Sequence, residues 1–122
     1  MEPLLKLTNV KKSFGDVHAI EQVNLDIDKH SVIGLVGGNG AGKTTLLRLM
    51  SGVYRPTSGS VELENNRPVS EMRSVLGVVP ESTGLYSKMT AWENIRYHSR
   101  LHGIDDQLAW DRTYRFAQLL DI

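Results

Sequence analysis

Apolar and polar residues alternate in three short segments of the chain, at 5–8, 23–28 and 61–64. An alternation with a period of two places apolar side chains on one face of a strand and polar side chains on the other. Strands with one solvated face are usual in antiparallel sheets, which need cover on one side only. We therefore expect these three segments to form an antiparallel sheet.

Two other segments, 32–36 and 75–79, are almost continuously apolar. Such runs are typical of strands that helices cover on both faces, as in parallel sheets. The pattern therefore predicts a parallel core made of these two strands. The segments 54–60 and 65–68 are rich in turn-forming residues and are predicted to be turns or loops between the regular elements.

The first predicted helix begins inside a glycine-rich stretch and ends near Gly52, a residue type that often terminates helices. Apolar residues follow the start of this helix at the spacing i, i+3, i+4 and i+7, which places them on one helical face. We expect the buried face to consist of Leu46, Leu49, Met50 and Val53.

Two more helices are predicted near the C-terminus. Thr90-Ala91-Trp92-Glu93 matches the capping box S/T-x-x-E, so a helix should start there and run to about Leu101, before Gly103. Asp105 and Asp106 favour a further helix start, because negative charge stabilises a helix N-terminus. This last helix is expected over 107–120, with an interior side formed by Leu108, Phe116, Leu119 and Leu120.

The composition limits the possible classes of protein. A chain of 122 residues, 40% of them hydrophobic, can form one domain or a part of one. The 14 basic and 14 acidic residues cancel, which disfavours a nucleic-acid partner. Cysteine is absent, which excludes disulfides and fits a reducing compartment. No apolar run approaches the about 20 residues of a membrane span, so we expect a soluble, cytoplasmic chain.

The stretch GGNGAGKTT at 37–45 fits the phosphate-binding template G-x-x-x-x-G-K-[ST] at every fixed position. Backbone N–H groups at a helix start can converge on phosphate oxygens, and glycines allow this close approach. We expect unusual backbone dihedrals at three of the glycines. The predicted phosphate-binding residues are Gly37, Gly38, Asn39, Gly40, Ala41, Gly42, Lys43, Thr44 and Thr45, with the unusual dihedrals at Gly37, Gly40 and Gly42.

The polar side chains of this loop have separate expected roles. Lys43 should bring positive charge to the terminal phosphates and to the transition state, the Thr44 hydroxyl should bind Mg²⁺, and Thr45 should offer another donor. A glycine-rich turn that merely joins a strand to a helix is the alternative. The presence of the lysine and the hydroxyl, between an apolar run and an amphipathic helix, favours phosphate binding.

Four motifs together resemble the ATP-binding subunit of ABC transporters. GGNGAGKTTLL at 37–47 resembles the family's GPNGAGKTTLL loop, with Gly38 in place of the proline. PTSGSV at 56–61 resembles the family's PTSG strand entry, and VVPE at 78–81 lies where its Q-loop begins. The residues 84–94 are similar to the LTVxEN entry to its helical subdomain.

This resemblance implies an α/β fold of the P-loop NTPase class, in its ABC form. The expected fold has a mixed sheet, an antiparallel β subdomain and the start of a helical subdomain. The β subdomain and phosphate-loop core should occupy 1–80, and the Q-loop and the start of the helical subdomain 81–122.

The resemblance also assigns two residues outside the loop. Phe14 occupies the position of the family's A-loop aromatic, whose ring stacks on adenine; the alternative is a turn aromatic packed against the sheet. Glu81 stands where most relatives have a glutamine that contacts Mg²⁺, and a carboxylate is also a hard oxygen ligand. An ordinary solvated glutamate is the alternative at this position. The Pro-Glu pair is similar to that of export-type members.

Three parts of the family's catalytic machinery have no counterpart in the sequence: the acidic Walker B pair, the switch histidine and the LSGGQ signature. The late run Leu119-Leu120-Asp121 has no acidic neighbour, and the four histidines precede the position of a switch histidine. We expect ATP binding without efficient turnover and no catalytic residue within the chain. The hypothesis is that the chain is the N-terminal portion of a longer ATPase, either naturally truncated or artificially shortened.

The implied cofactors are ATP and Mg²⁺, and the implied partners are a transmembrane permease and a second ATP-binding subunit in a head-to-tail dimer. The complex would lie on the cytoplasmic face of a membrane. The segment 82–97 would contact the permease, with Trp92 and Tyr86 as candidate anchors. A non-transport ABC protein of translation or DNA repair, or a nucleotide-binding interaction module without turnover, are the alternatives. A small kinase or GTPase would not explain the PTSG and Pro-Glu matches.

Overall fold

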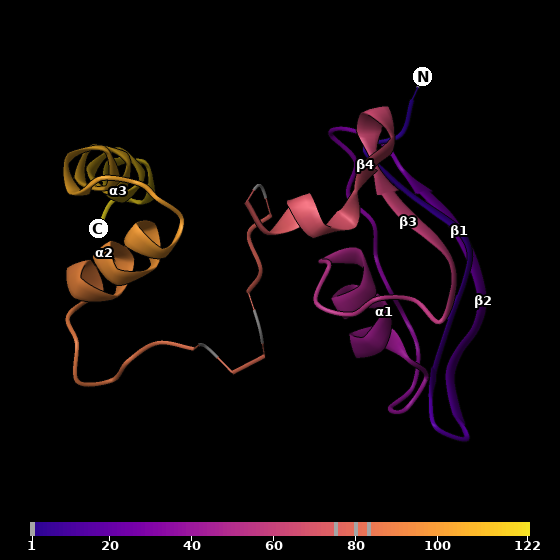
Figure 1. Ribbon diagram of the computed structural model, residues 1–122. Coiled ribbons are helices and arrows are strands. Elements are labelled where there is room, and N and C mark those ends of the chain that lie inside the picture. The colour runs from indigo at the N-terminus through magenta and orange to yellow at the C-terminus, as the bar shows by residue number, and fades with distance from the viewer. Residues whose placement is uncertain (1, 75, 80, 83) are drawn as a thin grey trace. The chain divides into compact units, whose positions relative to one another are not determined.

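The computed structural model describes residues 2–74, 76–79, 81–82 and 84–122 (Figure 1). The chain divides into two compact units, Met1–Gly77 and Val78–Ile122. The first unit holds a β-sheet and the helix α1, and the second holds the helices α2 and α3.

The sheet of the first unit is antiparallel throughout its described residues. The strands β1 (Leu5–Phe14) and β2 (Val17–Ile27) form a long hairpin. The strands β3 (Ser58–Leu63) and β4 (Arg67–Pro68) extend it to four strands in the order β2-β1-β3-β4. Each predicted alternating segment lies almost wholly within one of the first three strands, so the prediction of an antiparallel sheet is confirmed. Two short 3₁₀ helices, η1 (Glu64–Asn66) and η2 (Val69–Ser74), follow β3 and β4.

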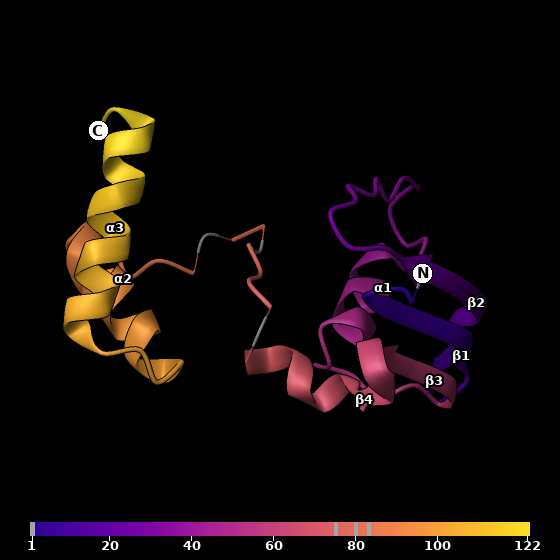
Figure 2. The ribbon, with the colours of Figure 1, turned by 90° about the horizontal axis from the view of Figure 1, so that it is seen from above.

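The core of the first unit lies between this sheet and α1 (Lys43–Met50), which covers one sheet face in Figures 1 and 2. Leu5 and Leu7 of β1 are buried with a period of two, as are Val61 and Leu63 of β3, and a register shift after Leu7 moves the next buried residue of β1 to Val10. Leu46 and Leu49 are the buried residues of α1, as predicted, whereas Val53 lies beyond the helix end and is exposed. The buried cluster consists of Leu5, Leu7, Val10, Ile20, Leu46, Leu49, Val61 and Leu63.

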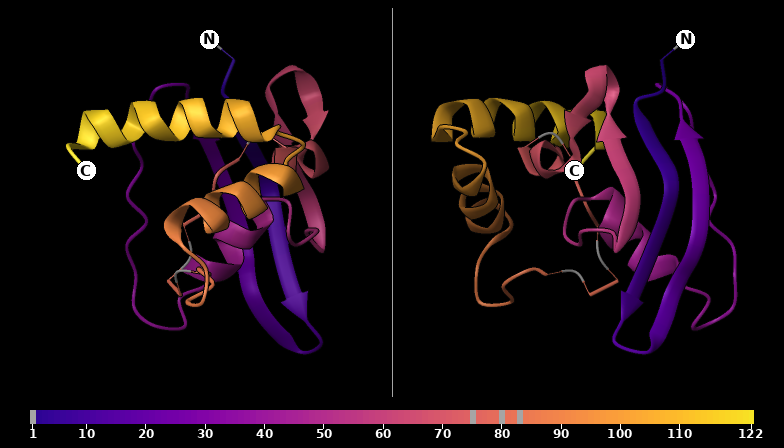
Figure 3. Two further views of the ribbon diagram at one scale, coloured as in Figure 1. Left: turned by 90° about the vertical axis from the view of Figure 1, so that its left-hand side faces the viewer. Right: turned by 45° about the vertical axis from the view of Figure 1, so that its right-hand side comes forward.

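The predicted parallel core is not formed. Residues 31–38 contain neither helix nor strand (Figure 3), and Val32 and Val36 are 99% and 96% exposed. Residues 76–79 also lack a strand, and Val75 lies outside the described residues. A strand needs hydrogen-bonded neighbours, and among the described residues neither run has one. The prediction was wrong because an apolar run indicates a preference for burial but supplies no pairing partner.

The second unit is a pair of helices, α2 (Ala91–Leu101) and α3 (Asp106–Leu120). The capping box is confirmed, since Thr90 Oγ1 accepts from the N–H of Glu93 at 3.2 Å and a Glu93 carboxylate oxygen accepts from the N–H of Thr90 at 2.7 Å. Asp105 caps α3 by accepting from the N–H of Leu108 at 3.0 Å. Both helix starts therefore follow the local rules on which they were predicted.

The predicted interior side of α3 is wrong. The buried residue of this helix is Ala109, whereas Phe116 is 61% exposed and the other three predicted residues are exposed as well. Within the second unit, α2 is the helix that packs against α3, through contacts such as the edge-to-face pair of Trp92 and Trp110 at 4.9 Å between ring centroids. A single neighbouring helix covers only one stripe of α3, and the apolar stripe at its C-terminal half stays uncovered.

The capping box leads to a pH-dependent prediction. The N–H of Thr90, and then its hydroxyl, hold the pKa of Glu93 below the usual value. The unfolded chain therefore binds this proton more readily, so the stabilisation is complete above the unfolded pKa of the carboxyl and is lost as the pH falls through its lowered folded pKa. We expect an NMR titration to give a depressed Glu93 pKa that Thr90→Val raises only part of the way, because the backbone donor remains.

Thr113→Val is the control for this titration, because the Thr113 hydroxyl donates to the Ala109 carbonyl within α3 and does not contact Glu93. An identical Glu93 pKa in the wild type and in Thr90→Val would contradict the prediction that the hydroxyl lowers the pKa of this carboxyl.

Candidate functional site

Residues 37–42 form a loop that leads directly into α1, with Gly42 as the N-terminal cap. The N–H of Ala41 donates to the Gly38 carbonyl at 3.2 Å, and that of Leu46 donates to the Gly42 carbonyl at 2.9 Å. Within the described part of the chain, the N–H groups of residues 43–45 donate to no protein acceptor, and the first turn of α1 has no acidic residue. Three backbone donors and the positive end of the helix dipole therefore point toward one place, which suits an anion.

The glycines of the loop are required for two different reasons. Gly40 and Gly42 have φ angles of 82° and 91°, as predicted for unusual dihedrals. A Cβ on Gly42 would also lie 2.7 Å from the Ala19 carbonyl oxygen, so the loop backbone packs directly on β2. The prediction for Gly37 was wrong, because its φ is not positive. Its constraint is space, since a Cβ there would lie 3.1 Å from the Cβ of Ala41.

The ammonium of Lys43 folds back over the loop. Its Nζ donates to the carbonyl oxygens of Gly37 and Gly38, the latter at 2.7 Å. Both acceptors are neutral backbone carbonyls of the loop that precedes α1. A phosphate oxygen is a stronger acceptor for an ammonium than a neutral carbonyl, so an arriving phosphate could take over these hydrogen bonds.

The oxygen ligand available for Mg²⁺ at the start of α1 is a hydroxyl group, and the described residues form no carboxylate cluster. Among the described residues, no group of three or more His, Asp or Glu side chains could hold a metal. Mg²⁺ usually keeps several waters and binds substrate phosphates with one or two protein oxygens, and the exposed Thr44 hydroxyl suits such a set. Glu81 is exposed and belongs to the second unit, so its metal contact stays a prediction.

Phe14 lies at the end of β1, in the hairpin with β2, and its side chain is 44% exposed. Its ring meets that of Tyr54 edge to face, at 5.4 Å between centroids. The Lys12 ammonium lies 4.9 Å from the centroid of the Phe14 ring. The Phe14 ring is thus in contact with two neighbours and partly exposed to solvent. Its stacking on adenine stays a prediction. The sequence reasoning treated Tyr54 as part of a turn and missed this contact across 40 positions.

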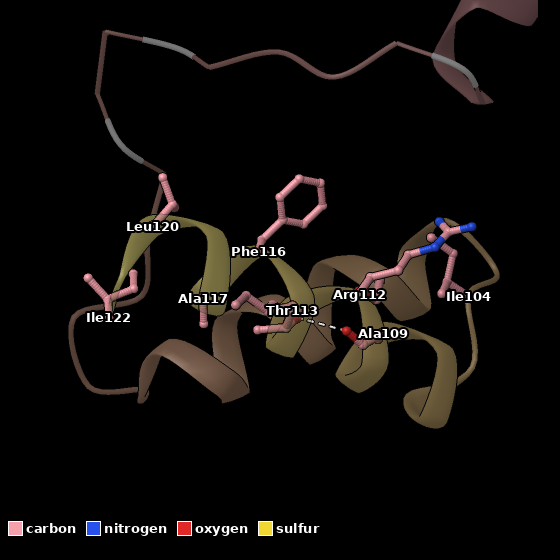
Figure 4. A pocket seen from close by; sticks show the side chains of 10 residues that line it. Ile104, Ala109, Arg112, Thr113, Phe116, Ala117, Leu120 and Ile122 are labelled. Carbon is pink, nitrogen blue, oxygen red and sulfur yellow. Dashed lines mark hydrogen bonds between the residues drawn. The ribbon is translucent and has the colours of Figure 1, made fainter.

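The second unit carries a different kind of cavity, about 390 Å³ in volume (Figure 4). Most of its lining is apolar, and the cation among the labelled residues is Arg112. Such a groove offers too few donors for a triphosphate, which needs several paired oxygens. The lining residues are Ile95, Ser99, Ile104, Ala109, Arg112, Thr113, Phe116, Ala117, Leu120 and Ile122.

The two candidate anchors for a partner differ in their surroundings. Trp92 is half-buried against Trp110 within the second unit. Tyr86 is exposed, lies edge to face with Tyr97, and has its backbone N–H bonded to the buried side chain of Asn94 at 2.8 Å. Contact of either residue with a permease stays a prediction. No helix in the described part of the chain has the length and apolarity needed to cross a bilayer.

A comparison with protein families matches residues 20–121 to the family described as ABC transporter. The chain belongs to the ABC transporter ATP-binding family. NatA of Bacillus subtilis, an ABC transporter ATP-binding protein, is 37% identical over 84% of this chain and 45% of its own length. The bacitracin transport ATP-binding protein BcrA of Bacillus licheniformis is 30% identical over 98% of this chain and 40% of its own length. This ABC-family chain therefore spans less than half the length of these curated relatives.

Solved structures confirm the fold class of this ABC-family chain. CbiO1 of Clostridium perfringens, described as part of an ABC transporter complex, superposes with a TM-score of 0.79 at 22% identity, over 97% of this chain and 50% of that one. A dimeric bacterial ABC transporter cassette gives a TM-score of 0.70 at 27% identity, over 80% and 47% of the two chains. The described chain is thus a partial ABC ATPase fold, an antiparallel β subdomain with helices.

The packing of Gly42 on β2 predicts unequal effects of two alanine substitutions. Gly42→Ala combines a positive φ with a clash against the Ala19 carbonyl, whereas Gly40→Ala has the positive φ with no atom within 4 Å of the new Cβ. Left-handed strain alone costs about 1–2 kcal/mol, and we expect Gly42→Ala to cost about 2 kcal/mol more in urea unfolding. Equal unfolding midpoints for the two variants would contradict the close contact.

Proposed function

We propose that this chain binds MgATP as the ATP-binding component of an ABC transporter, with residues 37–45 as the phosphate site. The observation that supports this most is the geometry at the start of α1. Among the described residues, the N–H groups of residues 43–45 have no protein acceptor, the helix dipole is positive at the same end, and the Lys43 ammonium lies on the loop that precedes the helix. Charge-assisted hydrogen bonds from these donors would bind the β- and γ-phosphates.

The remaining site residues extend this proposal to the metal and the base. Thr44 would bind Mg²⁺ through its hydroxyl, and Glu81 would add a carboxylate oxygen. When bound, the metal ion neutralises phosphate charge. The open part of the Phe14 ring would stack on adenine, an interaction worth about 1–3 kcal/mol.

The proposed physiological role is transport, in the export direction. The relatives named for bacitracin transport and for lantibiotic transport support a transport role. The export direction rests on Glu81, whose position after a proline resembles that of export-type members. A transmembrane permease and a second ATP-binding subunit are the proposed partners, which would hold the chain at the cytoplasmic face of a membrane.

We further propose that the 122-residue chain binds ATP without efficient turnover. Phosphoryl transfer needs a positioned water and several charges around the γ-phosphate. This sequence contains the phosphate loop but no acidic Walker B pair, switch histidine or LSGGQ signature. Lys43 would then contribute to binding, with no complete set of groups to activate the attacking water.

Calorimetric titration of the purified chain with MgATP tests the phosphate site. Lys43→Ala removes a charge-assisted donor worth about 1.5–3 kcal/mol, so we expect affinity to fall by about 10- to 100-fold. Lys6→Ala is the matched control, since Lys6 is an exposed lysine of β1 between two core residues, and it should bind like the wild type. Equal affinities for Lys43→Ala and the wild type would contradict the proposed site.

A steady-state assay of phosphate release tests the proposal on turnover. We expect no ATP hydrolysis above the buffer rate at saturating MgATP, because the groups that position water are missing. Hydrolysis that Lys43→Ala abolishes would show that the chain itself carries a competent catalytic site.

A further inference from the structure

Tyr54 connects the aromatic end of β1 to the helix α1. Its half-buried ring packs against the core cluster and meets the ring of Phe14 edge to face at 5.4 Å. Its hydroxyl accepts a hydrogen bond from an Arg48 guanidinium nitrogen at 2.8 Å, and the Arg48 Cζ lies 5.4 Å from the ring centroid. The N–H of Tyr54 donates to the Arg48 carbonyl at 3.0 Å. Tyr54 is therefore fixed to α1 at three points while its ring supports Phe14.

Lys12 of β1 adds a second cation beside the rings of Phe14 and Tyr54. Its ammonium lies 4.9 Å from the centroid of Phe14 and 5.6 Å from that of Tyr54, and it donates to the Arg55 carbonyl at 2.9 Å. The salt bridges in the described part of the chain involve other basic residues. Lys12 therefore lies over both rings and Arg48 over the ring of Tyr54, at distances that favour cation–π attraction.

We propose that Tyr54 is a positioning residue for nucleotide-base binding, which holds the Phe14 ring in the orientation that stacks on the base. This inference rests on the proposed function, in which Phe14 stacks on adenine. A partly exposed ring at the end of a hairpin has several staggered rotamers, and selecting one of them on binding lowers affinity. Contact with Tyr54 restricts the ring before the ligand arrives.

The same contact links the base site to the phosphate site. Arg48 and Lys43 lie on one short helix, so Tyr54 joins the Phe14 ring to the element whose first N–H groups face the phosphates. A rigid connection of this kind fixes the separation between the stacking ring and the phosphate donors. The proposed role therefore affects the base-dependent part of the affinity and leaves the phosphate-dependent part unchanged.

The test compares MgATP with magnesium tripolyphosphate, which has the phosphates and no base. Phe14→Ala should weaken MgATP binding about tenfold and leave tripolyphosphate binding unchanged, as expected for the loss of a base stack. Tyr54→Leu keeps an apolar side chain against the core but removes the ring, and it should weaken MgATP binding about fivefold with tripolyphosphate unchanged. Tyr54→Phe keeps the ring and should restore most of the affinity for MgATP.

The double variant Phe14→Ala, Tyr54→Leu tests whether Tyr54 affects MgATP binding through Phe14. If Tyr54 acts through Phe14, the double variant binds MgATP as weakly as Phe14→Ala and no more weakly. Additive losses would overturn the proposal, because Tyr54 would then act independently of the ring. Equal losses for MgATP and tripolyphosphate in Tyr54→Leu would overturn it as well, because they indicate a general disturbance of the loop.

The outcomes also separate this inference from the proposed function. A loss in Phe14→Ala with no loss in Tyr54→Leu contradicts the positioning role and leaves base stacking intact. No base-dependent loss in Phe14→Ala contradicts stacking itself, and the positioning role with it. Tyr54→Met, which fills the space with a flexible apolar chain, replaces Tyr54→Leu if that variant does not fold, and the same results are expected of it.

Discussion

The packing of α1 on one face of the antiparallel sheet is the constraint on which the rest of the structure depends. Leu46 and Leu49 enter the apolar face formed by the strands, and Gly42 brings the loop backbone against the Ala19 carbonyl. A helix of eight residues is too short to be stable alone, so tertiary packing must supply most of its stability. Because the helix is fixed at this place, its first N–H groups face a common point, and the end of the loop at Gly42 lies against β2.

The aromatic contacts connect α1 to the last residue of β1, Phe14, next to the turn of the β1–β2 hairpin. Arg48 lies on α1, Tyr54 is bonded to Arg48, and the ring of Phe14 rests on Tyr54. Tyr54 and the distant Phe14 are thereby held near α1. Residues 20–121 of the chain match the ABC transporter family. The helices α2 and α3 form a separate unit, and the two grooves described in it are lined mostly by apolar surface, which offers few donors for a polyphosphate.

Local signals in the sequence predicted much of this correctly. The capping box at Thr90 and Glu93, the alternation at the start of β1 and the positive φ angles of Gly40 and Gly42 depend on near neighbours, so the sequence suffices to find them. Predictions that depend on contacts between residues far apart in the sequence were less accurate. The run at 32–36 has no neighbouring strand among the described residues, and Phe116 has no helix over it within its unit. The Phe14–Tyr54 contact was missed for the same reason, because no local pattern indicates a pairing over 40 positions.

The central claim is that the first turn of α1 is a phosphate site in this chain, and amide NMR tests it most directly. A ¹⁵N-labelled sample would be titrated with magnesium tripolyphosphate. We predict saturable shifts of the N–H signals of Lys43, Thr44 and Thr45, which have no protein acceptor among the described residues, and a smaller shift for Leu46, whose N–H is bonded to the Gly42 carbonyl. Unchanged signals for these three residues at saturating ligand, or equal shifts spread over both units, would contradict the claim.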